Sequence, residues 1–569
     1  MKIKPLYAHG SLLAIALGAC VQDVNVGALD GASTDSAAQT DTMNSADRAA
    51  ADAIVAPDAG MDASAPDAMS AIDASSTDSS ATIDAMSTPD AAPWPDAIIA
   101  DVGPVMPGTE TARTALTGNL TSAAYTSDDR TMFAWLAIGG RTERDLYSID
   151  TITGAANLLL SSVRIDSNLG AQAPLGDRVV AFQALRTVGT SSGWVTVFFD
   201  ATTRREIVAG APQDFGVASL VHNGALYVAL STAAQPAEET PFGTRYRYRR
   251  QLRRYALDTG AMTGSYDLPW GYFDSFAIWQ QQGSTLYLAP SWSCPVMPGA
   301  TCDARIDPAP FIRIDLATMT PTSMPPLPSG AARASGSSGT ELYVTRDRAI
   351  YARDAITSSE RLLLAAPADA RESASIQVAP DGSRAIIAST VTMAGMVGRL
   401  RDLQLYLPSS RAMVALPTRL GDASASVDLS AGAELSQVVF RRDQTTELWF
   451  IVRSGASTIS WVVADLDARG TLVRSRGFSQ SIESPVYQSN RSSIVRTPDG
   501  LREFVLRRDL ATGFLQVNSA PTGSPESAFA PITSIATDHT LLGAPSNDRV
   551  TFLARDPMRG FVSLFARGL

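Results

Sequence analysis

The chain has 569 residues, of which 45% are hydrophobic, and carries 46 basic against 57 acidic residues. The formal net charge of −11 originates in residues 21–110, which hold sixteen acidic residues and a single arginine. The rest of the chain is close to neutral, so its bulk electrostatics indicates neither a nucleic-acid nor an acidic partner.

The first twenty residues have the pattern of an export signal. Lys2 and Lys4 precede a short apolar run, Leu12–Ala19, which is well below the ~20 residues that a membrane-spanning helix needs. The run ends in Leu17-Gly18-Ala19-Cys20.

This ending resembles the lipobox of bacterial lipoproteins. The resemblance implies cleavage of residues 1–19 as a signal peptide and lipidation of Cys20. Val21, in place of an aspartate, implies delivery to the outer membrane, with the protein anchored to the membrane and not spanning it. The expected location is the cell envelope, either periplasmic or surface-exposed. The alternative is an ordinary cleaved signal peptide with an incidental cysteine.

Residues 20–110 predict a disordered linker. They consist almost entirely of Ala, Asp, Ser, Thr, Pro, Met and Gly, with aspartates spaced along the whole segment. Such a composition cannot bury enough apolar surface to offset the loss of chain entropy. We expect a stalk with a root-mean-square span on the order of 50 Å. Compositional drift is the alternative explanation.

From residue 111 onward the chain repeats a strand–turn–strand unit. Asp145–Leu160 shows it best: an alternating strand, a turn at Asp150–Gly154 and a second strand. Matching Asp150 with Asp509 gives seven steps of about 51 residues, which is typical of β-propellers. Similar stretches are Trp194–Asp200, Leu252–Gly260, Phe311–Met319, Ile350–Thr357, Leu403–Pro408, Trp461–Gly470 and Phe504–Gly513.

The predicted fold for residues 111–569 is all-β: a propeller of seven or eight four-stranded blades, with eight preferred. About nine units can be counted, the last truncated from Ile535, but closed rings usually have four to eight blades. We expect the ring to close by adding Arg113–Leu116 to a sheet formed by Val550–Leu553 and Phe561–Phe565. A pair of ordinary β-sandwiches is the alternative.

Three turn sequences resemble the S-P-D-G turn of TolB-like, WD40-like propeller repeats. They are Ser127–Arg130, Ala379–Gly382 and Thr497–Gly500. The resemblance implies the propeller fold and brings no catalytic residue with it.

A candidate ligand-binding surface lies in the units near residues 225–330. Their extra residues fall in loops expected on one face: Ala233–Thr244, Leu268–Asp274 and Pro290–Pro310. Arginine and aromatic side chains together can stack on and hydrogen-bond to a ligand. The alternative is a solvated edge strand whose charges prevent aggregation. The candidate residues are Arg245, Tyr246, Arg247, Tyr248, Arg249, Arg250, Trp270, Tyr272 and Trp292.

Cys294 and Cys302 are the two cysteines besides Cys20. They bracket a short Pro/Gly-containing loop in a chain expected to be exported, which predicts a disulfide. Closing a loop of this size stabilises by roughly 2.5 kcal/mol in the chain-entropy model.

Motifs for catalysis or for metals are weak. Gly189–Gly193 matches G-x-S-x-G but is expected in a β-hairpin, and not in the strand-to-helix elbow of a hydrolase. His222 is expected in a turn and His539 in a loop between blades, while Asp465–Gly470 lacks the later acidic ligand of a calcium loop. We predict no catalytic residue, no metal and no cofactor.

The sequence therefore favours an envelope lipoprotein whose propeller binds or scaffolds an unidentified envelope protein or polysaccharide. Nucleic acid is not expected as a partner. The alternative is a propeller hydrolase or lyase that acts on polysaccharide or peptide through carboxylates in the central channel.

Overall fold

The computed structural model describes residues 98–100 and 108–569, apart from short gaps in the second range. The predicted signal peptide and nearly all of the predicted linker, including Cys20, therefore lie outside the described residues. The gaps are 117, 138–141, 166–173, 213, 241–242, 272–275, 291–311, 324–332, 339–340, 355–356, 370–371, 392–398, 442, 454–458, 480–492 and 556–561.

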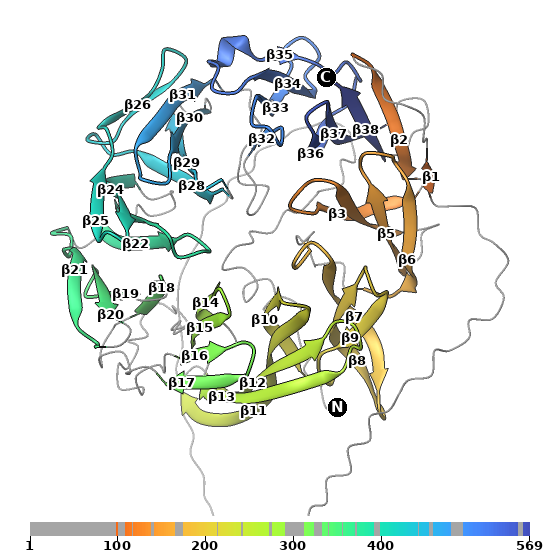
Figure 1. Ribbon diagram of the computed structural model, residues 1–569, viewed down its shortest axis with the longest axis vertical. Coiled ribbons are helices and arrows are strands. Elements are labelled where there is room, and N and C mark those ends of the chain that lie inside the picture. The colour runs from red at the N-terminus through yellow and green to blue at the C-terminus, as the bar shows by residue number, and fades with distance from the viewer. Residues whose placement is uncertain are drawn as a thin grey trace, which may run out of the picture. The chain divides into compact units, whose positions relative to one another are not determined.

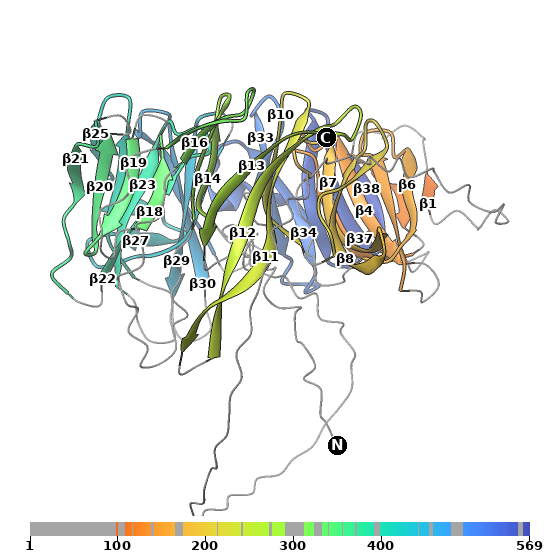
Figure 2. The same ribbon diagram turned by 90° about the horizontal axis from the view of Figure 1, so that it is seen from below.

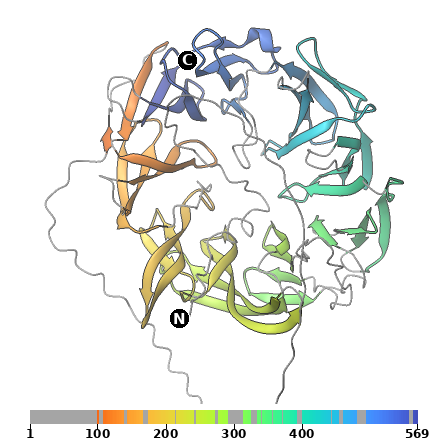
Figure 3. The ribbon, with the colours of Figure 1, turned by 180° about the vertical axis from the view of Figure 1, so that it is seen from behind.

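Nine antiparallel sheets stand around a ring as the blades of a propeller (Figures 1 and 3). The all-β prediction is confirmed, and the prediction of seven or eight blades is wrong. The unit from Ile535 onward is a full blade, because its missing outer strand comes from the other end of the chain. The described residues include no α-helix, and thus no helix able to cross a membrane.

Blades 1 to 3 follow one another along the chain. In blade 2 the inner position is taken by an isolated bridge from Ile165 to Ala184. The strands are β3 (Asn119–Tyr125), β4 (Thr131–Ala137), β5 (Arg144–Asp150) and β6 (Ala156–Val163) in blade 1; β7 (Val179–Val188), β8 (Ser191–Asp200) and β9 (Arg205–Val208) in blade 2; β10 (Phe215–His222), β11 (Ala225–Thr240), β12 (Gly243–Ala256) and β13 (Met262–Gly271) in blade 3.

Blades 4 to 6 have four strands each. The strands are β14 (Phe276–Gln282), β15 (Thr285–Pro290), β16 (Ile312–Asp315) and β17 (Thr320–Ser323) in blade 4; β18 (Arg333–Ser337), β19 (Glu341–Arg346), β20 (Ala349–Asp354) and β21 (Glu360–Leu364) in blade 5; β22 (Glu372–Val378), β23 (Ala385–Val391), β24 (Arg399–Leu407) and β25 (Ala412–Ala415) in blade 6. A two-stranded hairpin, β26 (Arg419–Gly421) and β27 (Ser426–Asp428), follows blade 6.

Blades 7 to 9 complete the ring. The strands are β28 (Glu434–Phe440), β29 (Thr446–Arg453), β30 (Ile459–Leu466) and β31 (Leu472–Phe478) in blade 7; β32 (Ile494–Arg496), β33 (Arg502–Arg508), β34 (Leu515–Pro521) and β35 (Ala530–Pro531) in blade 8; β36 (His539–Ser546), β37 (Arg549–Arg555), β38 (Val562–Gly568), β2 (Glu110–Leu116) and β1 (Ile98–Ala100) in blade 9. A single 3-10 turn, Glu526–Ala528, precedes β35.

Blade 9 closes the ring with strands from both ends of the described chain. β2 pairs antiparallel with β38, from Glu110 opposite Arg567 to Leu116 opposite Val562, which confirms the predicted closure. β2 also contacts blade 1, because Arg113 Nη2 donates to the Thr153 carbonyl (2.5 Å) and Thr114 Oγ1 donates to that of Gly154 (2.8 Å).

Glu110, at the start of β2, reaches toward blade 8. Its carboxylate accepts a hydrogen bond from the backbone N–H of Ser534 (2.7 Å). β2 therefore touches three consecutive blades.

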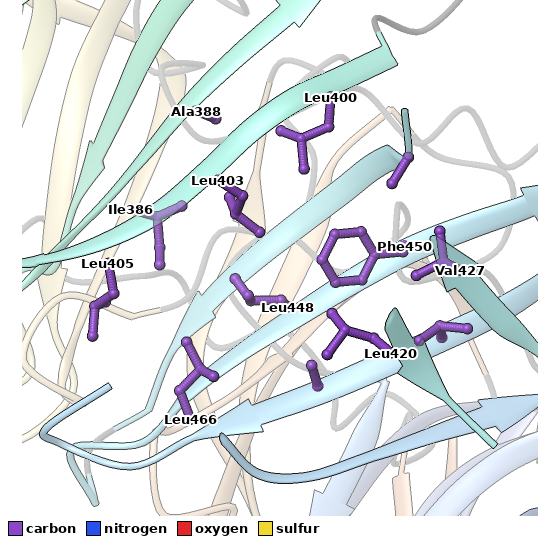
Figure 4. Packing of buried hydrophobic residues seen from close by; sticks show 13 residues of the cluster. Ile386, Ala388, Leu400, Leu403, Leu405, Leu420, Val427, Leu448, Phe450 and Leu466 are labelled. Atoms are coloured by element: carbon purple, nitrogen blue, oxygen red, sulfur yellow. The ribbon is translucent and has the colours of Figure 1, made fainter. Parts of the chain in front are cut away.

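The core consists of layers between neighbouring blades. Second strands such as β29 are buried along most of their length, because both faces of each sheet pack against another sheet. Figure 4 shows the layer between blades 6 and 7, where Leu405 of β24 shares one buried cluster with Leu448 and Phe450 of β29, to which the β26–β27 hairpin adds Leu420 and Val427. Each fully buried side chain of this kind contributes roughly 1.5–3 kcal/mol by leaving water.

The three predicted S-P-D-G-like turns each join the first and second strands of a blade. The short polar side chains hold the reversal, as turn chemistry predicts. Hydroxyl-to-carboxylate hydrogen bonds close all three turns: Thr126 to Asp128 (2.7 Å), Ser383 to Asp381 (2.7 Å) and Thr497 to Asp499 (2.6 Å).

Candidate binding face

The propeller has two faces with different connections. One face carries the turns that join first to second and third to fourth strands. The other, here called the hairpin face, carries the links from second to third strands and the links between blades. On the hairpin face the β11–β12 hairpin of blade 3 projects beyond its neighbours (Figure 2).

The strand register explains this projection. β10 accompanies β11 only as far as Ser231, and β13 accompanies β12 only as far as Tyr248. Beyond these points β11 and β12 continue alone to the pair Thr240–Gly243. The prediction of a loop at Ala233–Thr244 is therefore wrong, since most of this segment is β-strand.

Pro236 made a strand difficult to foresee, because proline cannot donate to a β-ladder. In the structure the register shifts between Pro236 and Glu238, so the proline sits at an irregularity. The hairpin has no third strand at this point, and bulges are common in such edge positions.

The predicted ligand-binding residues fall into three groups. Arg245, Tyr246 and Arg247 lie in the two-stranded extension, and Tyr248 lies at its base. Arg249 is exposed, whereas Arg250 is 1% exposed and enclosed in the blade. Trp270 lies on β13, and Tyr272, Trp292, Cys294 and Cys302 lie outside the described residues.

The strands that bound the two other predicted loops end beside this hairpin. The prediction of a loop at Leu268–Asp274 is wrong for its first half, since Leu268–Gly271 is the end of β13 and Gly271 lies opposite Tyr248. β14 and β15 meet at the pair Phe276–Pro290. These strand ends, together with the start of β16 at Ile312, all lie at the hairpin face, in blades 3 and 4. The shared face predicted for the loops is consistent with these ends.

A hydrogen-bonded row of polar side chains lies at the base of the hairpin. Asp267 on β13 accepts from Arg249 Nη2 (2.9 Å) and from Gln251 Nε2 (3.0 Å), and Gln251 Oε1 accepts from Arg253 Nε (2.7 Å). Arg253 in turn donates to the Ala209 carbonyl of blade 2 (2.9 Å). The hydrogen bond from Arg249 lowers the pKa of Asp267, so this carboxyl is ionised at neutral pH.

A second set of charges is enclosed between blades 7 and 8. Arg476 makes a bidentate pair with Glu503 (2.5 and 3.0 Å), and Arg496 contacts both Glu503 (2.9 Å) and Asp465 (2.8 Å). Glu447 lies opposite Asp465 in register and accepts from the Trp449 indole N–H (2.5 Å). Glu447, Asp465 and Glu503 are at most 2% exposed.

The arginines decide the ionisation of this set. Burial alone would raise the pKa of Glu503, but Arg476 and Arg496 outweigh burial and hold it at about 2. Burial and the Glu447 carboxylate raise the pKa of Asp465. Enclosed carboxylates that are bound by arginine link the two blades, and they offer no exposed acid to a substrate.

A similar contact joins blades 5 and 6. The Tyr406 hydroxyl donates to Glu341 (2.5 Å), which also accepts from Arg361 (3.1 Å). Burial, together with Glu341, raises the pKa of Tyr406 to about 12, so the phenol stays protonated and remains a donor. This cluster is again an inter-blade link.

The weak catalytic and metal motifs prove to be turns or core. Gly189–Gly193 spans the link between two strands, β7 and β8, and His222 lies next to the turn between β10 and β11. Asp467 accepts the backbone N–H groups of Arg469 (2.9 Å) and Thr471 (2.8 Å), as a turn residue does. No three potential ligands gather into a metal site within the described residues.

His539 is not in a loop, contrary to the prediction. It begins β36, is 0% exposed and stacks on Phe552 with ring centroids 4.5 Å apart. Its Nδ1–H donates to the Thr537 carbonyl (2.8 Å), and burial lowers its pKa to about 4. The neighbouring aspartate, Asp538, is typical of a loop. The neutral imidazole of His539 instead packs in the core on Phe552, as an aromatic side chain would.

Sequence reasoning missed Trp194 and the charges between blades 7 and 8. Trp194 was assigned to a strand but not to a surface, although it is 40% exposed. Glu447 and Glu503 each precede an apolar run in a second strand, and several arginines lie in the neighbouring strands. That pattern was a usable signal for buried ion pairs.

Comparisons with known proteins identify no family for this chain. No family model matches the chain, and no curated protein matches it. Among solved structures, a prolyl endopeptidase is 12% identical with a TM-score of 0.34; the match covers 61% of this chain and 45% of that one. The present chain thus spans less than half of the endopeptidase.

Two further structures cover most of their own length. The oligogalacturonate lyase of Vibrio parahaemolyticus is 12% identical with a TM-score of 0.33, covering 82% of this chain and 98% of that one. The WD40 domain of SCAP from fission yeast is 10% identical with a TM-score of 0.32, covering 79% and 95%. Likeness at this level carries no argument about activity.

Proposed function

We propose that the protein is a lipid-anchored component of a bacterial cell envelope whose nine-bladed propeller binds or scaffolds a protein or glycan partner. The observation that carries the proposal is the β11–β12 hairpin. It runs past both of its neighbouring strands and presents the segment Arg245–Tyr248 at one face.

The composition of the extension supports a binding role. A hairpin that only protected a sheet edge would need a few charges, and the alternating Arg245-Tyr246-Arg247-Tyr248 sequence exceeds that need. Tyrosine and arginine are also the residues that most often dominate the affinity of interfaces. Glu238 lies opposite Arg245 in register, which limits the net charge of the tip.

The proposed anchor follows from the N-terminal residues. Lys2, Lys4, the apolar run and Cys20 resemble a lipoprotein signal, and the acid-rich segment that follows would lift the propeller from the membrane. The expected site is the outer membrane, on its periplasmic or external side.

A hydrolase or lyase is less well supported. It would need accessible carboxylates, whereas the facing pair Glu447–Asp465 is enclosed and bound by arginine. The described residues thus give these acids a role between blades.

The test is crosslinking in intact cells, comparing the full protein with a variant in which residues 234–248 are replaced by Asn-Gly. The pair Ala233–Arg249 would then close a short hairpin and leave the blade intact. We expect capture of the envelope partner to fall at least tenfold. The control replaces Arg245 and Arg247 by lysine, which keeps the charge and the strand pairing. Undiminished capture by the shortened variant would refute the role of the hairpin in binding the partner.

The anchor needs a separate measurement. Cys20→Ala should move the protein from the membrane fraction to the soluble fraction of the envelope, since the change removes the atom that carries the lipid. Retention in the membrane fraction would contradict lipidation and would leave the hairpin test unaffected.

A further inference from the structure

Trp194 lies in a part of blade 2 that resembles the hairpin of blade 3 on a smaller scale. β8 pairs with the outer strand β9 only from Val197 onward, so its first half extends past β9 toward the hairpin face. Trp194 lies in this half, just beyond Thr196, whose carbonyl accepts from the Ala209 N–H (3.1 Å), and it is 40% exposed. Thr196, two residues later, accepts a hydrogen bond from the Gly216 N–H of blade 3 (3.0 Å). Because strand side chains alternate, Trp194 lies on the side that faces blade 3.

The side of blade 3 that faces Trp194 carries the polar row described above. Arg253 and Tyr255 both donate to the Ala209 carbonyl of blade 2 (2.9 and 3.2 Å), so these alternate positions of β12 face blade 2. Gln251 and Arg249 continue the same alternation toward the hairpin tip. Asp267, opposite Gln251 in register, joins them.

The two sets lie at the same height. Gly216 pairs with Leu230, and Leu230 pairs with Gln251, which places Thr196 level with Gln251. One alternate step toward the hairpin face then places Trp194 level with Arg249. At this height the side chains of Arg249 and Asp267 are 49% and 57% exposed. An exposed indole therefore stands level with an exposed, hydrogen-bonded row of polar groups, and the strand that carries it contacts β10, two strand spacings (about 10 Å) inward of β12.

We propose that this surface, formed by Trp194, Arg249, Gln251 and Asp267, binds a neutral oligosaccharide. The inference rests on the proposed binding function and names the class of ligand at the base of the same hairpin. An exposed indole offers a flat apolar surface whose covering contributes on the order of 2 kcal/mol. A pyranose ring has a matching face of C–H groups.

The polar row fits hydroxyl groups. Its carboxylate, amide and guanidinium groups offer both acceptors and donors, and their mutual hydrogen bonds fix their orientation before a ligand arrives. Arg249 and Asp267 offset each other's charge, and Arg253 of the same row interacts electrostatically with Asp214, so a polyanion would gain little from this surface. Charge balance thus favours a neutral saccharide over an acidic one.

The experiment is calorimetric titration of the full protein with cellohexaose, maltohexaose and chitohexaose. Hexagalacturonate and a random decapeptide library serve as anionic and peptide comparators. We expect at least one neutral hexasaccharide to bind with a Kd below about 1 mM. Trp194→Ala should weaken that binding at least tenfold and Asp267→Asn about fivefold, while Trp194→Phe should retain most of it. Leu510→Ala, which removes an 85% exposed side chain on blade 8, is the matched control and should bind as the wild type.

The proposal is overturned if no neutral saccharide binds, if only hexagalacturonate or only the peptides bind, or if Trp194→Ala binds as tightly as the wild type. The variant shortened at residues 234–248 keeps all four residues. Saccharide binding by that variant with unchanged envelope capture would refute the hairpin and support the Trp194 surface. If the shortened variant loses envelope capture and the full protein binds no saccharide, the hairpin is supported and the Trp194 surface is refuted.

Discussion

Arg476 and Glu503 link blades 7 and 8 at a place that water does not reach, with side-chain exposures of 3% and 0%. Replacing one partner of a buried pair leaves the other charge without compensation, which costs more than the pair contributes. We expect Arg476→Met to lower the free energy of unfolding by about 3 kcal/mol, because Glu503 keeps Arg496. Denaturant titration measures the loss.

The matched control is Arg453→Met. Arg453 pairs with Glu434 at a similar distance, but its side chain is 52% exposed. Solvent screens such a pair, and its loss should cost less than about 1 kcal/mol. Equal losses in the two variants would contradict the role of burial.

His539 should make stability depend on pH. Its pKa in the folded protein is about 4, below the ordinary value of 6.5, so the unfolded chain takes up the proton first as the pH falls. The stabilisation is fully present above pH 6.5 and is lost as the pH falls through 4, a change of about 3 kcal/mol. His539→Asn cannot titrate and should show a flatter decline over this range in denaturant titrations at successive pH values. An unchanged slope would contradict this account.

At the scale of single elements, the β5–β6 turn of blade 1 contacts β2 of blade 9 and so helps to join the two blades. Gly154 in this turn has φ +76°, and an added Cβ would lie 2.7 Å from the Arg113 carbonyl oxygen of β2. Gly154→Ala should therefore cost about 1 kcal/mol for the backbone conformation and a further 1–3 kcal/mol for the clash.

Gly500→Ala supplies the comparison. Gly500 has φ +70°, but nothing lies within 4 Å of an added Cβ. It should show the conformational cost alone, so the difference in thermal unfolding between the two variants isolates the contact with β2. No difference would mean that β2 shifts away at little cost.

The sequence predicted individual strands and turns better than it predicted the number of blades. The strand–turn–strand unit Asp145–Leu160 and the S-P-D-G-like turns follow from local alternation and turn chemistry, which act over a few residues. Phe504–Gly513 was matched to third strands, but β33 is the second strand of blade 8, with β34 as the third. The two strands differ in what they pack against, which local sequence does not encode.

The sequence predicted where the candidate site lies, but not that it is an extended hairpin or which of its side chains are exposed. The cluster of arginine and tyrosine drew attention to β12, but the extension of the hairpin depends on where β10 and β13 stop. The enclosure of Arg250 and the exposure of Trp194 depend on how strands that are separate in sequence are arranged in space. Such contacts leave no local pattern.

At the scale of the whole molecule, the ring should depend on β2. A chain that begins at Gly118 lacks β1 and β2 and leaves the outer edge of β38 open, since β38 pairs with β2 at six positions. We expect a Tm lower by about 5 °C or more, together with association through the open edge. A chain that begins at Gly108 keeps β2 and should unfold near the wild-type temperature. Calorimetry and size-exclusion chromatography distinguish these outcomes, and equal stability of the two chains would refute the dependence.

The pairing of β2 with β38 also determines the earliest time at which the ring can close during synthesis of the chain. Leu116 leaves the ribosome roughly 450 residues before its partner Val562, a delay of about 20–90 s at ordinary rates of translation. For that time β2 has no β38 with which to pair, however early the first blades assemble. The ring therefore cannot close before β38 has been synthesised, and a nascent chain stalled inside blade 9 would leave β2 as an unpaired edge that is open to association with other chains.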